Sequence, residues 1–297
     1  MQAKPLIALV VISVGLTTTY ARAVIRSDSV MIAVLEVQRD STSVRPLFKK
    51  HGRDWEPFAN QLDEKLRTEL PQSGDWAVLH NDGKAERLRS VLDSQAWREQ
   101  RDVGRHVLMP RTSTPPRGAG SARQTFSFWD GVAMIESPAM LSTGRYAGST
   151  GKWQASKLTA AETARFRARF RELVPEVPRC NAKGIITNPA AHYSDDAIRA
   201  TVVFRSKSGR MLAGLVLDPT STCTGPVDAA GSIHWMAGVP GVAPSFIGNQ
   251  MQLVDKVDCD GDGHSEWLFF LTARNENGYA LFYDDFQRSA RMTWTYQ

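Results

Sequence analysis

Acidic residues at every second position mark the segment Asp258-Cys259-Asp260-Gly261-Asp262-Gly263-His264-Ser265-Glu266. A calcium-binding loop has carboxylates at positions 1, 3 and 5, a glycine at position 6 that permits a sharp turn, and an inward-facing carbonyl at position 7. The segment has this pattern when Asp258 is counted as position 1, and a glutamate at position 9 would close the coordination shell. It therefore predicts a Ca²⁺ site whose ligands are Asp258, Asp260, Asp262, the carbonyl of His264, and Glu266.

Two other interpretations of this loop are weaker. A turn that binds no metal would leave three carboxylates repelling one another, and a cation is the usual means of holding such groups together. Mg²⁺ needs a strict octahedral shell, which suits a flexible loop less well. Position 12 is Phe269 and not Glu, and the apolar run 267–271 predicts a strand. We therefore expect a loop between two strands that stabilises the fold, and not a helix-loop-helix site or a catalytic centre.

The same residues resemble a known family. Asp-x-Asp-Gly-Asp-Gly-x-x-Glu followed by an apolar strand is similar to the calcium loops of FG-GAP and VCBS-type repeats, which occur in the β-propellers of integrin α subunits and in many secreted bacterial proteins. The resemblance covers Leu253 to Leu271 and implies the ligand set given above. The wider pattern, including N-G-Y-A-L-F-Y-D-D-F near the end, resembles uncharacterised exported bacterial proteins and implies no activity.

Residues 1–23 have the pattern of a signal peptide. Lys4 supplies a positive charge, Leu6 to Leu16 is mostly apolar, and Ala21-Arg22-Ala23 fits the small-x-small cleavage site. The apolar run is too short to span a membrane, which needs ~20 residues. We therefore expect an exported protein, periplasmic or extracellular, that has no stable membrane insertion after cleavage.

Composition predicts a globular protein with no nucleic-acid partner. The chain has 297 residues, of which 42% are hydrophobic and 23% charged, enough for residues 24–297 to form a single large β-rich domain. A Pro-, Gly- and Ser-rich loop at 110–123 is a possible boundary that would subdivide this domain.

Removal of residues 1–23 lowers the formal charge from +5 to +3. The densest basic run alternates along a predicted helix, which is typical of a solvated face: Arg165, Arg167, Arg169 and Arg171.

The hydrophobic pattern predicts a mainly β fold with helical insertions, either β-propeller-like or built from several sheets. Val30 to Val37 has the length and apolarity of a strand, and Pro46 places the strand 44–48 at a sheet edge. Hairpins are predicted at Asp82-Gly83 and Asp130-Gly131, between 198–204 and 211–217, and with a turn at Asn277-Gly278. Eight tryptophans at loosely regular intervals fit a blade-like repeat.

Two segments have helical patterns. Residues 60–70 carry leucines at positions 62, 66 and 70, which is the spacing of a short amphipathic helix. Thr159 and Glu162 form a capping box ahead of an apolar stripe that includes Phe166 and Phe170, and Pro175 ends the helix.

The three cysteines allow one disulfide in an oxidising compartment. Cys180 with Cys223 is the preferred pair, because both lie in Pro-containing segments that flank the predicted hairpin 198–217. Cys223 with Cys259 is the alternative. No C-x-x-C motif is present, which excludes zinc-cluster and thioredoxin-type sites.

Signals of catalysis are sparse, since neither H-E-x-x-H nor G-x-S-x-G occurs. His80 beside Asp82, and His192 near Asp195 and Asp196, have the spacing of turn residues more than of catalytic pairs. One of Asp284 and Asp285 is a possible distal ligand of the same metal ion. The sequence thus predicts an exported, calcium-stabilised, non-catalytic protein that binds an unknown protein or glycan, and the alternative is a secreted hydrolase acting on glycan or ester.

Overall fold

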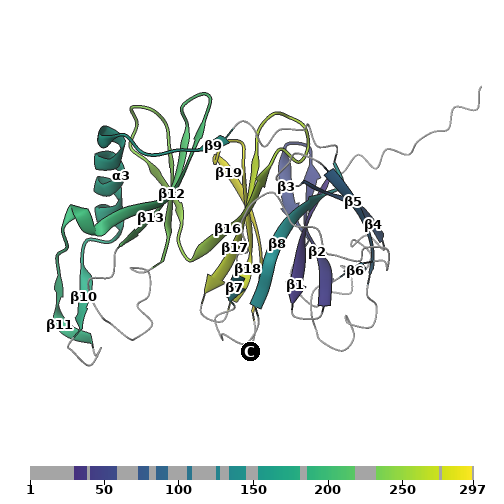
Figure 1. Cartoon of the computed structure of the whole chain (residues 1–297), viewed down its shortest axis with the longest axis horizontal. Helices are drawn as coiled ribbons and strands as arrows, with labels where there is room; N and C mark the ends of the chain where they lie inside the picture. Colours follow the sequence, from purple (N-terminus) through teal and green to yellow (C-terminus); the bar gives the residue numbers. More distant parts are fainter. Residues whose placement is uncertain are drawn as a thin grey trace, which may run out of the picture.

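The computed structural model describes residues 30–38, 41–58, 73–79, 85–92, 106–108, 125–127, 134–144, 153–180, 186–217, 232–273 and 276–295 (Figure 1). This part of the chain is mainly β, as predicted. The strands of its first sheet are β1 (Met31–Gln38), β2 (Ser41–His51), β3 (Asp54–Pro57), β4 (Ser73–Leu79), β5 (Ala85–Leu92), β6 (His106–Leu108), β7 (Thr125–Ser127) and β8 (Met134–Ser142).

In this first sheet, β1 lies between β2 and β8. On its other side β2 pairs with β6, and the order then continues through β5 and β4 to β8, which also pairs with β1. Every pair is antiparallel. The strand path encloses a cluster of apolar side chains that includes Leu35, Trp76 and Leu141. The hairpins predicted around Asp82-Gly83 and Asp130-Gly131 are confirmed as the strand pairs β4–β5 and β7–β8, whereas the turns themselves lie outside the described residues.

Two further sheets follow in the chain. One has the order β15-β14-β13-β12-β9, and the other is the meander β16-β17-β18-β19. The small pair β10–β11 stands apart from them. Their strands are β9 (Trp153–Ala155), β10 (Val177–Cys180), β11 (Ile186–Ala191), β12 (Ile198–Ser206), β13 (Met211–Leu217), β14 (His234–Gly238), β15 (Ser245–Gly248), β16 (Met251–Val257), β17 (Glu266–Ala273), β18 (Glu276–Tyr283) and β19 (Arg288–Thr295).

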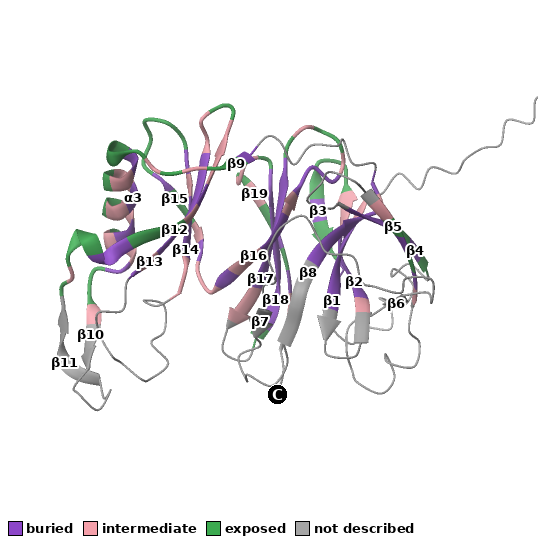
Figure 2. Ribbon diagram, viewed as in Figure 1, coloured by how far each residue is buried: buried purple, intermediate pink, exposed green. Residues whose placement is uncertain are grey.

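The sheets are stacked in layers with a hydrophobic core in each gap (Figures 1 and 2). From left to right in the view lie helix α3 (Ala160–Leu173), the β9–β15 sheet, the β16–β19 sheet and the first sheet. Phe270 and Leu281 face the first sheet, whereas Trp267 and Phe269 face the β9–β15 sheet. Side chains of successive strand residues point to opposite faces, so the apolar run Trp267 to Leu271 supplies both cores of the central layer.

A buried polar network also joins the central layer to the first sheet. The Tyr279 hydroxyl on β18 donates to Glu36 Oε1 on β1 over 2.9 Å, and Arg45 Nε on β2 donates to the same oxygen over 2.9 Å. Glu36 and Arg45 are fully or almost fully buried. A buried charge is tolerated when it is paired and hydrogen-bonded, so this network fixes how the two layers are aligned.

Helix α3 confirms the prediction for residues 159–174. Thr159 is the N-cap, Glu162 completes the capping box, and Phe166 and Phe170 are buried against the β9–β15 sheet. The short 3-10 helix η2 (Asp195–Ala197) lies near its C-terminal end, where Arg171 pairs with Asp195. The basic run is therefore partly paired on the protein surface.

Two local predictions are wrong. The strand containing Pro46 is not at an edge, because β2 pairs with β1, β3 and β6. The register between β1 and β2 shifts next to Pro46, and this irregularity accommodates a residue that has no N–H group. Asn277 and Gly278 lie within β18 and do not form a turn. A Cβ on Gly278 would lie 2.3 Å from the Met292 carbonyl oxygen, so close strand packing and not turn geometry requires this glycine.

The described helices include none that is both long and apolar enough to cross a membrane. Several predictions fall outside the described residues and stay predictions: the signal peptide 1–23, the helix 60–70, the loop 110–123 and Cys223.

Candidate metal loop and adjoining pocket

The predicted calcium loop connects β16 to β17 and is flanked by the residue pair Val257 and Glu266. Asp258, Asp260 and Asp262 each place one carboxylate oxygen within 4.8 Å of the others. The structure thus brings together three of the predicted ligands, and it confirms that the loop joins two strands.

Backbone N–H groups orient these carboxylates. Asp258 accepts hydrogen bonds from Gly261 N (2.8 Å) and Gly263 N (3.0 Å) through its two oxygens. Asp260 and Asp262 each accept one bond through Oδ1, from the N–H two residues later. Gly261 and Gly263 have φ values of 78° and 92°, in the left-handed region that glycine adopts at little cost. The two glycines therefore allow the loop to fold around its own carboxylates.

Glu266 lies outside the cluster of three. Its Oε2 accepts a hydrogen bond from Cys259 N over 2.7 Å, so it braces the start of the loop from the first residue of β17. Burial, followed by the nearby charge of Asp260, raises the pKa of Glu266 to about 9. Burial also raises the pKa of Asp258. Both shifts reflect a negative cluster that is partly withdrawn from water.

The His264 side chain faces Asp285 and not the cluster. Its Nδ1 lies 3.3 Å from Asp285 Oδ2, and Arg210 also reaches this oxygen, over 3.0 Å. Asp285 is therefore occupied as a partner of His264, and in the described part of the chain it is not grouped with the three aspartates. Coordination by the His264 carbonyl stays a prediction.

Lys50 is the cation that balances this cluster in the structure. Its ammonium group contacts Asp260 Oδ2, lies 3.9 Å from Asp262 Oδ2, and sits 5.6 Å from the centre of the Trp55 ring. Burial alone would lower the pKa of Lys50, but the hydrogen bond and charge of Asp260 outweigh it and the pKa is raised. A divalent cation at the three aspartates would compete with this ammonium group for the same oxygens.

The loop also packs directly on the first sheet. Ser142 Oγ, at the end of β8, donates to the Cys259 carbonyl over 3.2 Å. A Cβ on Gly144 would lie only 2.2 Å from this carbonyl oxygen. Cys259 itself is fully buried, and burial raises its thiol pKa well above the ordinary value. The unusual cysteine inside the loop is thus a core residue that anchors the loop between two sheets.

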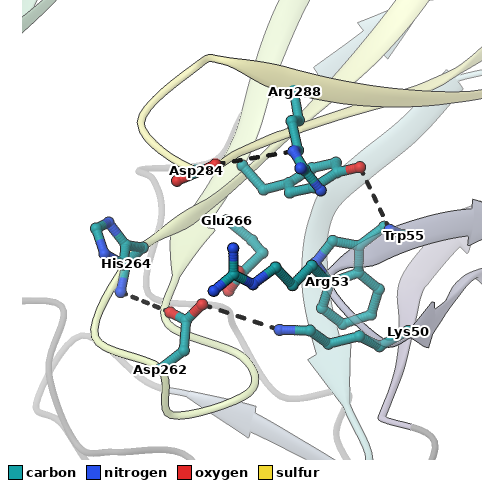
Figure 3. Close-up of a pocket in the computed structure, with 9 residues that line it drawn as sticks. Lys50, Arg53, Trp55, Asp262, His264, Glu266, Asp284 and Arg288 are labelled. Atoms are coloured by element: carbon teal, nitrogen blue, oxygen red, sulfur yellow. Dashed lines mark hydrogen bonds and ion pairs between the residues drawn. The ribbon is translucent and has the colours of Figure 1, made fainter.

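A polar pocket of about 480 Å³ opens beside the loop (Figure 3). It lies between the β2–β3 turn, the loop and the β18–β19 turn. Its walls combine basic, acidic and aromatic side chains, namely Lys50, Arg53, Trp55, Asp262, His264, Glu266, Tyr283, Asp284 and Arg288. Most of these residues have no local sequence signal, because the pocket is assembled from segments more than 200 positions apart.

The other predicted sites are not brought together among the described residues. His192 is exposed and lies 3.7 Å from Glu176, whereas the buried His234 donates a hydrogen bond from Nδ1 to the Ser232 carbonyl over 3.0 Å. Cys259 is a free thiol, so the alternative disulfide Cys223–Cys259 is wrong.

Comparison with protein-family models, curated proteins and solved structures gave no match, and the function has to be inferred from the chain's own residues.

Proposed function

We propose that this chain is an exported, non-catalytic binding module whose β layers are fixed to one another by a Ca²⁺ ion on the loop between β16 and β17. The observation that carries the proposal is the convergence of Asp258, Asp260 and Asp262 within 4.8 Å. Three carboxylates at this separation repel one another strongly, and oxygen-only ligands on a flexible loop favour Ca²⁺.

The position of the loop supports a structural role for the ion. The loop belongs to the central sheet, but Ser142, which donates a hydrogen bond to the Cys259 carbonyl of the loop, belongs to the first sheet. An ion that orders the loop would therefore order a contact between two layers. Because bound ligand stabilises only the folded state, the free energy of unfolding would rise with Ca²⁺ concentration.

Calcium titration calorimetry tests the proposal. We expect the wild-type chain to bind one Ca²⁺ ion per molecule, with Asp258→Asn reducing the affinity at least ten-fold. Asp284→Asn is the matched control, since Asp284 is a nearby exposed carboxylate outside the cluster, and it should retain wild-type affinity. If the wild type released or absorbed no heat on calcium addition, or if both variants lost the same affinity, a calcium site at these aspartates would be refuted.

We also propose that the last two sheets are organised like successive propeller blades. The strands β12 to β15 and β16 to β19 form consecutive antiparallel meanders, and they pack face to face through Trp235, Trp267 and Phe269. Such stacking supports the blade-like comparison for this part of the chain only. Its test is an experimental structure of the complete chain.

A secreted hydrolase acting on glycan or ester is the second candidate function. The pairing of His264 with Asp285 at the pocket favours it, because a carboxylate that orients a histidine is one requirement of general-base catalysis. Release of chromophore from nitrophenyl esters and glycosides by the wild type, and its loss in His264→Ala, would support this function. Equal rates in the two proteins would refute it.

A further inference from the structure

The pocket beside the loop contains a cationic side chain, Arg53, that has no partner in the part of the chain that the structure describes. Lys50 is paired with Asp260, and Arg288 Nη1 lies 2.7 Å from Asp54 Oδ1. Arg53, on the turn between β2 and β3, is exposed, and within the described residues it forms no ion pair or hydrogen bond. Figure 3 shows its side chain extending across the pocket towards the side that carries Asp262 and Glu266.

A guanidinium group in this position suits a carboxylate. Its planar set of N–H donors forms two parallel hydrogen bonds with the oxygens of a carboxylate, which a single ammonium group does not do. Arg288 lines the same pocket, but its guanidinium group is paired with Asp54. Its nearest acidic neighbour in the pocket, Asp284, lies 3.8 Å away and is about half exposed. Arg53 thus provides the positive charge that is free to bind a ligand, and the paired Arg288 lies on the same pocket wall.

The remaining walls are suited to hydroxyl groups. Asp284 and His264 each have 48% of their side-chain surface exposed, so both can form hydrogen bonds with a ligand. Trp55 is buried and closes one side of the pocket as a rigid wall. A volume of about 480 Å³ falls in the range of small-molecule sites. The combination fits a small ligand that carries one carboxylate and several hydroxyls.

We propose that this pocket binds a sugar carboxylate, a uronic acid, with Arg53 as the main partner of the carboxylate. The inference rests on the proposed calcium function in one respect. An ion on the loop would neutralise Asp262 and its neighbours and displace Lys50 from Asp260, leaving this ammonium group beside Arg53. Ca²⁺ and the uronic acid would then bind with positive coupling, and each would raise the affinity for the other by the same factor.

Calorimetry on the full-length chain tests the pocket, with D-galacturonate and D-glucuronate as probes and D-galactose and D-glucose as neutral controls. In the presence of Ca²⁺ we expect at least one uronate to bind, and its neutral counterpart to bind at least ten-fold more weakly. Arg53→Gln should weaken uronate binding at least ten-fold. Arg291→Gln, an exposed arginine on β19 outside the pocket, should leave it unchanged.

Three results would overturn the inference: no binding of either uronate, equal binding of the neutral sugars, or unaltered binding by Arg53→Gln. A Ca²⁺ titration of the same samples separates this failure from that of the proposed function. Calcium binding without uronate binding removes the pocket proposal alone. Uronate binding that needs Arg53 but occurs without any calcium binding supports the pocket and removes the calcium proposal.

Discussion

Lys50 on β2 and Asp260 on the β16–β17 loop form an ion pair across 210 positions of the chain, and this pair joins the first sheet to the central one. The ammonium group occupies the side of the acidic cluster that faces the pocket. It therefore acts both as a link between two layers and as an internal competitor for any metal ion at the cluster.

This competition predicts the effect of Lys50→Met. Methionine has a similar length but no charge, so a metal ion no longer has to displace an ammonium group from Asp260. We expect the affinity for Ca²⁺ to rise about ten-fold, equivalent to ~1.4 kcal/mol, in a calorimetric titration. Lys49→Met is the control, because neighbouring strand side chains point to opposite faces. Weaker calcium binding by Lys50→Met would show that Lys50 assists the ion and does not compete with it.

The pair formed by Glu162 and Arg205 predicts a pH dependence of stability far from the loop. Arg205 Nη2 lies 2.7 Å from Glu162 Oε2, and hydrogen bonds from Arg205 lower the pKa of Glu162 from 4.5 to about 2. A lowered pKa stabilises the folded state above the unfolded pKa, and this contribution is lost as the pH falls from about 4.5 to about 2.

Glu162→Gln tests this contribution, because glutamine retains an acceptor for Thr159 N but carries no charge. We expect a loss of roughly 1–2 kcal/mol in urea denaturation at pH 7, shrinking towards zero near pH 2. Glu172→Gln removes an exposed pair with Arg169 and should cost less than ~0.5 kcal/mol. A difference between Glu162→Gln and wild type that stays constant down to pH 2 would rule out the ion pair as its cause.

The buried position of Cys259 predicts a free, slowly reacting thiol. Burial raises its pKa, and the thiolate is the reactive form. Alkylation of the native chain should leave Cys259 unmodified, whereas alkylation after denaturation without reductant should modify it fully, as measured by peptide mass spectrometry. Recovery of a peptide disulfide-bonded through Cys259 would contradict the structure.

The sequence predicted those parts of the site that depend on local spacing. Asp258, Asp260 and Asp262 converge because their alternation and the two glycines encode the loop conformation by themselves. The capping box of Thr159 and Glu162 was predictable for the same reason.

Features that depend on tertiary contacts were not predictable. Lys50 and Arg53 belong to an ordinary hairpin and become site residues only because the first sheet packs on the central one. Asn277-Gly278 has a strong turn signal, yet tight packing against β19 places it within a strand. In the same way the alternating pattern predicted strands, but it contained no information on which strands pair or how the sheets are stacked.

Thermal unfolding of the wild-type chain in Ca²⁺ and in chelator tests the central claim most directly, with Asp260→Asn measured in parallel. At a Ca²⁺ concentration about 100-fold above the dissociation constant, the free energy of unfolding of the wild type should rise by about 2.7 kcal/mol, and the melting temperature should rise with it. Asp260→Asn should melt at the same temperature in both conditions. Equal melting of the wild type in Ca²⁺ and in chelator, or an equal rise in Asp260→Asn, would contradict a calcium ion that holds these layers together.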